Sequence, residues 1–207
     1  MEQPLPSECA LPCLMRGSLN RKAGYGRSTG FQEVLEFWFV DLEPRQWWMK
    51  DEALDQEIRQ RFAELHQDAI AGKLYNWRET GMGRLAEIIV LDQFSRNIYR
   101  DRPEAFSWDG MALVLAQEAV RIGADQELEA PEKAFFYMPY MHSESMAIHT
   151  QAVKLFDQPG VEFNLEFELK HKLIIDRFGR YPHRNSVLGR SSTPEEVKFL
   201  SQPGSSF

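Results

Sequence analysis

Residues 84–100, RLAEIIVLDQFSRNIYR, decide the fold class. The first half of this stretch is apolar on nearly every side when it is wound into a helix, and a helix that is apolar all round is buried. Pro103 follows shortly afterwards and stops the chain from continuing as a helix. We therefore expect a central helix over 84–100 with other helices packed around it.

The second half of this central helix carries charge. At about 100° per residue, Asp92, Arg96 and Arg100 share the face that is apolar one to two turns earlier. A face that changes from apolar to charged suits the wall of a pocket with an apolar floor and a polar mouth. The alternative is an Asp92–Arg96 ion pair within the helix, together with bridges to neighbouring helices.

Helical periodicity continues on both sides of the central helix. Apolar residues recur at helical spacing over 31–40 and over 51–70, with Asp51 suited to cap the second helix and Gly72 to follow its end. Further helices are predicted over 108–122 with Ser107 as N-cap, over 131–157, over 162–178 before Gly179, and after Thr193, where Glu196 completes a capping box. Pro139 removes a backbone hydrogen bond, so we expect a kink or a break there.

No strand-like alternation bounded by hairpin turns occurs, so the predicted fold class is all-α with about six to eight helices. Helix starts recur at intervals of roughly 25 to 33 residues, which fits antiparallel helix pairs stacked into a tetratricopeptide-like superhelix. The 207 residues suffice for one well-buried domain, which we place at 30–201 between a disordered leader at 1–29 and a flexible tail at 202–207.

Composition excludes several classes of function. A formal charge of −7 repels phosphate, so we expect no binding to nucleic acid or to acidic membranes. No apolar run approaches the roughly 20 residues that cross a bilayer, and a cytoplasmic protein is expected. Cys9 and Cys13 have no further ligand nearby, so we expect no metal site and no cofactor.

Residues 171–185, HKLIIDRFGRYPHRN, concentrate arginine and histidine just past a helix end. Gly179 and Pro182 would hold this turn in a fixed shape, and arginine forks bind carboxylate or phosphate through paired hydrogen bonds. The alternative is that these arginines tie helix ends and acidic helices together. The central helix and this turn supply the candidate ligand-binding residues, which are Asp92, Arg96, Asn97, Arg100, Arg177, Arg180, His183, Arg184 and Asn185.

His142 and His171 are candidate general bases. Glu144 or Asp92 could orient His142, because Pro139 can leave irregular backbone nearby. His171 lies on an apolar face, where a hydrogen-bonded core histidine is the commoner outcome, although such surroundings also suit acid–base chemistry. No nucleophile elbow, Walker loop, dinucleotide motif or zinc motif accompanies these residues, so the sequence leaves open whether the chain is an enzyme.

Five motifs occur in a characteristic order: LEFWF, LDQFSRNIYR, FYMPYMHSE, RFGRYPHRN and STPEE. Together, from about Phe31 to Leu200, they resemble the bacterial domain-of-unknown-function family 924. The resemblance implies an all-helical fold similar to tetratricopeptide-like superhelices, and it supplies no catalytic residues. The family pattern DQFPRN has proline where this chain has Ser95, which implies a local irregularity in the polar half of the central helix.

Three functions fit these observations. The leading hypothesis is a helical domain that binds a small anionic ligand or a peptide carboxylate in a polar pocket of arginine and histidine. The second is a hydrolase or transferase in the same pocket, with His142 or His171 as general base and arginines stabilising an oxyanion. The third is a helical-repeat scaffold that binds proteins on a concave surface. The pocket requires Arg96, His142 and His183 to meet in space, and the sequence predicts no oligomeric state.

Overall fold

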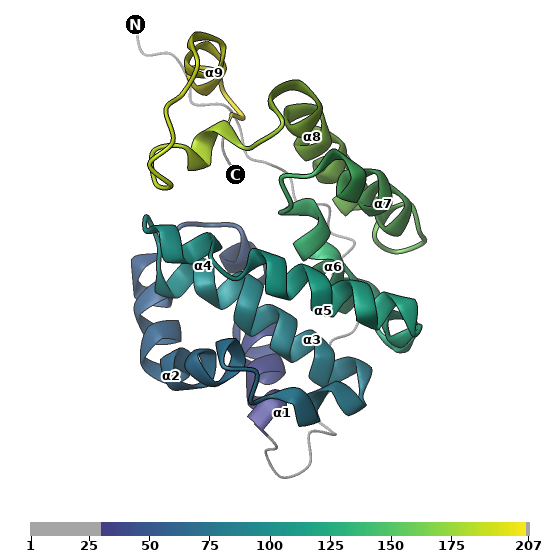
Figure 1. Ribbon diagram of the computed structural model, residues 1–207. Helices are drawn as coiled ribbons and strands as arrows, with labels where there is room; N and C mark the ends of the chain where they lie inside the picture. The colour runs from purple at the N-terminus through teal and green to yellow at the C-terminus, as the bar shows by residue number, and fades with distance from the viewer. Residues whose placement is uncertain (1–29, 206–207) are drawn as a thin grey trace, which may run out of the picture.

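Every regular element that the computed structural model describes, over residues 30–205, is helical (Figure 1). Within this range the segments α3, η5 and α4 run on without a break, so the nine α-helical segments form eight helices. The predicted all-α class is confirmed, while the stacking into a tetratricopeptide-like superhelix stays a prediction. None of the described helices is both long and apolar enough to cross a membrane. The leader predicted at 1–29 lies outside the described residues.

The helices follow one another along the chain with short 3-10 and π-helical turns between them. The N-terminal half contains α1 (Gly30–Glu36), η2 (Phe37–Asp41), η3 (Pro44–Trp47), α2 (Glu52–Ile70), η4 (Tyr75–Glu79), α3 (Gly81–Ile89), η5 (Val90–Phe94) and α4 (Ser95–Ile98). The C-terminal half contains η6 (Pro103–Phe106), α5 (Asp109–Arg121), η7 (Ala124–Glu127), α6 (Ala130–Met141), α7 (Met146–Phe156), α8 (Glu162–Phe178), η8 (Pro182–Arg184) and α9 (Pro194–Leu200). In Figure 1, α7 and α8 lie side by side and α9 lies beyond them, away from α1 to α5.

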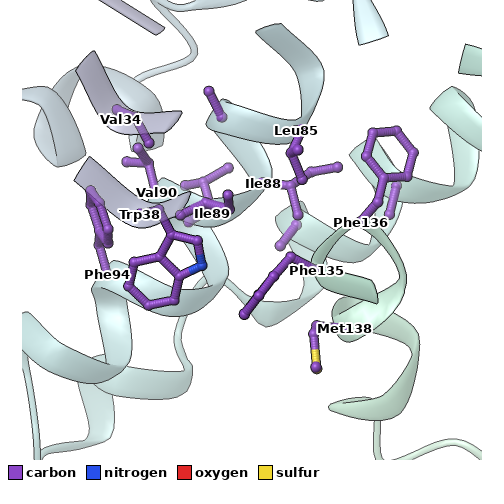
Figure 2. Packing of buried hydrophobic residues seen from close by; sticks show 14 of the residues in the cluster. Val34, Trp38, Leu85, Ile88, Ile89, Val90, Phe94, Phe135, Phe136 and Met138 are labelled. Carbon is purple, nitrogen blue, oxygen red and sulfur yellow. The ribbon is translucent and has the colours of Figure 1, made fainter. Parts of the chain in front are cut away.

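The central helix forms the middle of the core, as its apolar sequence predicts. Ile88 and Ile89 of α3 are fully buried, and Figure 2 shows them among aromatic rings from neighbouring helices. The ring of Trp38 lies edge-on to those of Phe94 and of Phe135 in α6, with centroids 5.7 and 5.5 Å apart. Aromatic pairs in this geometry add to the stability that burial of apolar surface already gives.

A π-helical turn, η5, interrupts the central helix where the resemblance implied an irregularity. Its member Asp92 is fully buried, and Ser95 follows the turn directly. Ser95 Oγ donates to the carbonyl of Leu91 at 2.5 Å, so it can only accept from His66 Nε2, 2.8 Å away. Single π-helical turns are rare and occur often at functional sites, which directs attention to Asp92.

Three helix ends were predicted correctly from local sequence. Asp51 accepts hydrogen bonds from two backbone N–H groups at the start of α2, and Thr193 and Glu196 form a capping box on α9. Gly179 ends α8 with a φ of 68°, a left-handed conformation that favours glycine.

One local prediction was wrong and another was wrong in part. Ser107 does not cap α5: its hydroxyl donates instead to the carbonyl of Pro103, and the helix begins two residues later at Asp109. Of the kink or break predicted at Pro139, the break does not occur there, because α6 continues to Met141 and the chain leaves the helix only over 142–145, while the kink stays a prediction. The buried packing of Ala134 to Met141 offsets the one backbone hydrogen bond that proline removes.

Candidate functional site

A pocket of about 330 Å³ lies between the first turn of α5 and the segment that contains Arg184 and Leu188. One side is formed by η6 and α5, and the other by the segment between α6 and α7 together with η8. The irregular backbone over 142–145 turns polar side chains toward this pocket. Its polar lining includes Asp109, His142, Glu144 and Arg184, and its apolar lining includes Phe106 and Leu113.

The buried Asp92 forms a pair with His142 of the pocket wall. His142 Nδ1 lies 2.8 Å from Asp92 Oδ1. Burial alone would raise the pKa of Asp92, but the charge of Arg96 and the contact with His142 outweigh it and lower that pKa to about 2. Because Asp92 is a carboxylate that can only accept, the imidazole carries its proton on Nδ1 and donates it to Asp92.

The second ring nitrogen of His142 faces away from Asp92. Burial and the neighbouring charge of Arg96 lower the pKa of His142, so the ring is neutral at pH 7 and Nε2 keeps its lone pair. Among residues 30–205 this nitrogen has no hydrogen-bonding partner, and 16% of the side chain is exposed at the pocket. His142 therefore offers the pocket a hydrogen-bond acceptor of fixed direction.

Two arginines converge on Asp109. Arg96 from α4 donates to both carboxylate oxygens of Asp109, at 3.1 and 3.2 Å, and Arg184 from η8 donates to Oδ2 at 3.0 Å. The other terminal nitrogen of Arg184 donates to the carbonyl of His142 at 3.1 Å. The guanidinium of Arg184 lies 4.5 Å from the ring centroid of Phe106 and 4.7 Å from that of Tyr181. This buried arginine is therefore held in a fixed plane between two rings.

Glu144 forms the far edge of the pocket. Arg190 binds both of its carboxylate oxygens, at 2.6 and 2.9 Å, and the backbone N–H of Tyr181 donates to Oε1 at 2.7 Å. Burial alone would raise the pKa of Glu144, but the hydrogen bonds from Arg190 and Tyr181 outweigh it and lower that pKa. Glu144 is therefore an ionised, partly exposed carboxylate that lines the same pocket as Arg184.

A second buried histidine fixes the backbone that carries His142. His149 Nε2 donates to the carbonyl of Ser143 at 2.8 Å, and its Nδ1 lies 2.7 Å from a carboxylate oxygen of Glu168. The hydroxyl of Tyr181 donates to the carbonyl of Met141 at 2.5 Å. Residues 141–143 are thus held from both sides, which orients His142 toward the pocket.

The predicted site residues separate into groups. The first group, Asn97 and Arg100, lies away from the pocket. Asn97 donates to Asp55 of α2 at 2.8 Å, and Arg100 binds both oxygens of the same carboxylate. The predicted shared face of Asp92, Arg96 and Arg100 was therefore wrong for its last member. The helix ends at Ile98, so a projection at 100° per residue does not apply to Arg100.

Other predicted residues tie α9 to the end of α8. Arg177 binds Glu195 and Arg180 binds both oxygens of Glu196, all within 3.0 Å. Asn185 also donates to Glu196, at 3.4 Å. For these three residues the contacts match the alternative in which the basic turn holds helices together.

His171 and His183 both contact the ring of Tyr181. Their ring centroids are 5.7 and 5.4 Å from that of Tyr181, and neither residue lines the pocket. His171 Nδ1 donates to the carbonyl of Phe167 at 2.8 Å, and burial lowers the pKa of His171 to about 3. Burial, aided by Arg184, lowers the pKa of His183 to about 4. Arg96 and His142 thus meet at Asp92, with His183 next to Arg184.

The sequence and fold also match known proteins. A family model described as "Bacterial protein of unknown function (DUF924)" matches residues 34–204. The chain belongs to this family. A solved structure from Agrobacterium tumefaciens, titled "Structure of Protein of Unknown Function ATU0120", is 36% identical, with a TM-score of 0.78, and the match covers 83% of this chain and 96% of that one. A comparison with curated proteins finds no match.

Sequence reasoning missed two charged residues of this DUF924 site, Asp109 and Arg190. Arg190 lies five positions past Asn185, so extending the basic turn by one short loop would have included it. Asp109 gives no comparable local signal, because its partner Arg184 is 75 residues away in sequence. Among residues 30–205, no group of three or more His, Cys, Asp or Glu side chains is arranged to hold a metal ion.

Proposed function

We propose that the pocket binds a small ligand carrying a carboxylate or phosphate group, at Arg184 and beside His142. The observation that carries this proposal is that the Arg184 guanidinium is only partly hydrogen-bonded within the protein. Each terminal nitrogen has two N–H groups, and the protein uses one of each, for Asp109 and for the His142 carbonyl. One N–H group on each terminal nitrogen and the buried Nε–H have no partner among residues 30–205, and a guanidinium binds an anionic group with two oxygens through such pairs of N–H groups.

The size and walls of the pocket favour a small molecule. Ligand sites range over about 300–1,000 Å³, and the 330 Å³ of this pocket lies at the lower end. Phe106, Leu113 and Leu188 supply apolar surface next to the polar groups. A formal charge of −7 disfavours nucleic acid as the source of the anion, so a free metabolite-sized carboxylate or phosphate in the cytoplasm is the ligand that we propose.

A thermal-shift screen of the full chain against small carboxylates and phosphates tests this proposal. A ligand that binds only the folded state raises the melting temperature by mass action. Arg184→Gln should abolish the shift, whereas Arg177→Gln should keep it, because Arg177 is exposed and paired with Glu195. No shift across the whole set for the native chain, or an equal shift in both variants, would overturn the proposal.

A second candidate function is hydrolysis or group transfer in the same pocket. The Asp92–His142 pair supports it, because a carboxylate that fixes an imidazole with its free nitrogen toward a pocket is the arrangement of a general base. No serine or cysteine is hydrogen-bonded to His142 among residues 30–205, so the base would act on water or on a ligand hydroxyl. Loss of ester or phosphoester turnover in His142→Gln, with folding retained, would support this function. The scaffold hypothesis, with its superhelix, has no comparable observation behind it.

A further inference from the structure

The charged groups around the pocket balance one another. Three arginines and three carboxylates are linked by ion pairs: Arg96, Arg184, Arg190, Asp92, Asp109 and Glu144. A ligand that brings only a negative charge would leave this partly buried group with one uncompensated charge. Burial of an unpaired charge is costly, so the site favours a ligand that carries its own positive charge.

The hydrogen-bonding capacity of the pocket points the same way. Glu144 Oε2 accepts a hydrogen bond from Arg190 alone, and Asp109 Oδ1 accepts from Arg96 alone. Each carboxylate oxygen has two acceptor positions, so each retains one. With the lone pair of His142 Nε2, three acceptor positions remain, whereas the terminal nitrogens of Arg184 have two unused N–H groups and the third unused donor, its Nε–H, is buried. An ammonium group on the ligand would supply three donors.

Arg184 and Glu144 both line the pocket, and both contact Tyr181. Its ring lies 4.7 Å from the guanidinium carbon of Arg184, and its backbone N–H binds Glu144 at 2.7 Å. A ligand with adjacent anionic and cationic groups could therefore meet Arg184 and Glu144 together. Apolar side chains of η6 and α5 line the same pocket and suit an aliphatic or aromatic substituent.

We infer that the ligand is a zwitterionic α-amino acid, with its carboxylate on Arg184, its ammonium on Glu144 and its side chain against Phe106 and Leu113. This inference rests on the proposed function and adds the class of ligand to it. Glu144 then decides between an amino acid and a plain carboxylate, since only the amino acid carries a charge that compensates this carboxylate.

Proton uptake offers a second way to distinguish the two kinds of ligand. A plain carboxylate can be compensated if His142 takes up a proton, because an added negative charge raises the pKa of that histidine. The charged and titratable groups that act on His142 are Asp92 of η5, Arg96 of α4, Asp109 of α5, Arg184 of η8, His171 of α8 and His183 of η8. Binding of an amino acid should take up no proton, because the ligand adds no net charge.

Calorimetric titration of the full chain with matched pairs of ligands tests the inference. The pairs are alanine and propionate, leucine and 4-methylpentanoate, and phenylalanine and 3-phenylpropionate, each differing only by the ammonium group. For the best side chain the amino acid should bind at least about tenfold more tightly, the minimum expected from a hydrogen bond to a charged group. Titration in two buffers of different ionisation enthalpy should show proton uptake for the carboxylate alone.

The outcomes separate the inference from the proposed function. Equal binding within every pair would overturn the amino-acid inference and leave the anion proposal standing, whereas no binding by any ligand would overturn both. Glu144→Gln should remove the preference for the amino acid, while Glu118→Gln, an exposed residue paired with Arg121, should retain it. If Glu144→Gln does not fold, because it also holds Tyr181 and Arg190, the pairs measured on the native chain decide.

Discussion

At the scale of single residues, the contact with Asp92 affects the pKa of His142. The carboxylate raises the pKa of His142 against the larger effects of burial and Arg96, which lower it. Asp92→Asn should therefore lower the pKa of His142 further, because the favourable charge is lost while the shape is kept. An NMR titration of the His142 ring protons measures this change.

Asp101→Asn is the matched control, because Asp101 is exposed and pairs with Lys50 at the surface. It should leave the pKa of His142 unchanged. A pKa of His142 that stays the same or rises in Asp92→Asn would contradict the assigned hydrogen bond between the two residues.

Individual residues also show which parts of the candidate site the sequence predicts and which parts it does not. Asp92 and Arg96 were recognised because charged residues stand out within an apolar helix, and Arg184 because it lies in a turn rich in arginine. The contacts of Asp92 with Arg96 and with His142 were among the predicted alternatives. The partner of Arg184, Asp109, was not predicted, because this ion pair is formed by tertiary packing rather than by local sequence. His149 was not among the candidate site residues, although its buried contact with Glu168 fixes the backbone of the pocket.

Close packing of the central helix gives a test at the element scale. A Cβ atom added to Gly83 would lie 2.0 Å from the carbonyl oxygen of Trp77, and backbone cannot easily move away. Gly83→Ala should therefore lower the free energy of unfolding by about 1–3 kcal/mol or more. Gly110→Ala in α5 should be neutral or stabilise by up to about 1 kcal/mol, since no atom lies within 4 Å of the added group.

Urea denaturation of the two glycine variants measures this difference. Equal stability of Gly83→Ala and Gly110→Ala would show that α3 does not pack against the preceding turn η4 as described.

Helix boundaries divide into those that local sequence determines and those that packing determines. Asp51, Thr193 and Gly179 were predicted correctly because a cap acts within one turn of its own residue. The end of α6 at Met141 could not be derived from Pro139 alone, because burial of the following residues outweighs a single lost hydrogen bond. The resemblance implied a local irregularity in the polar half of the central helix, whereas neither the resemblance nor the periodicity of the residues predicted that it is the π-helical turn η5.

The stability of the whole molecule should depend on pH through three buried histidines. Burial lowers the pKa of His66 to about 4, of His171 to about 3 and of His183 to about 4, from an ordinary value of 6.5. Between about pH 6.5 and 4 the unfolded chain therefore binds more protons than the folded chain, and the free energy of unfolding falls as the pH falls.

Each of these histidines contributes at most about 1.4 kcal/mol per pH unit within that window. Urea denaturation at several pH values measures the slope, and His171→Gln should make it shallower. A free energy of unfolding that stays constant, or rises on acidification, would contradict the burial of these rings in their neutral form.

The central claim is that one pocket, formed by distant segments of the chain, binds a small anionic ligand at Arg184 and His142. NMR of the full chain with 15N-labelled histidine, titrated with the carboxylates and amino acids above, tests it most directly. The account predicts a saturable change in the Nε2 signal of His142, with little change at His66, which is bound to Ser95 in the core. Unchanged His142 signals at ligand concentrations that saturate a calorimetric titration would show that the ligand binds elsewhere and would contradict the claim.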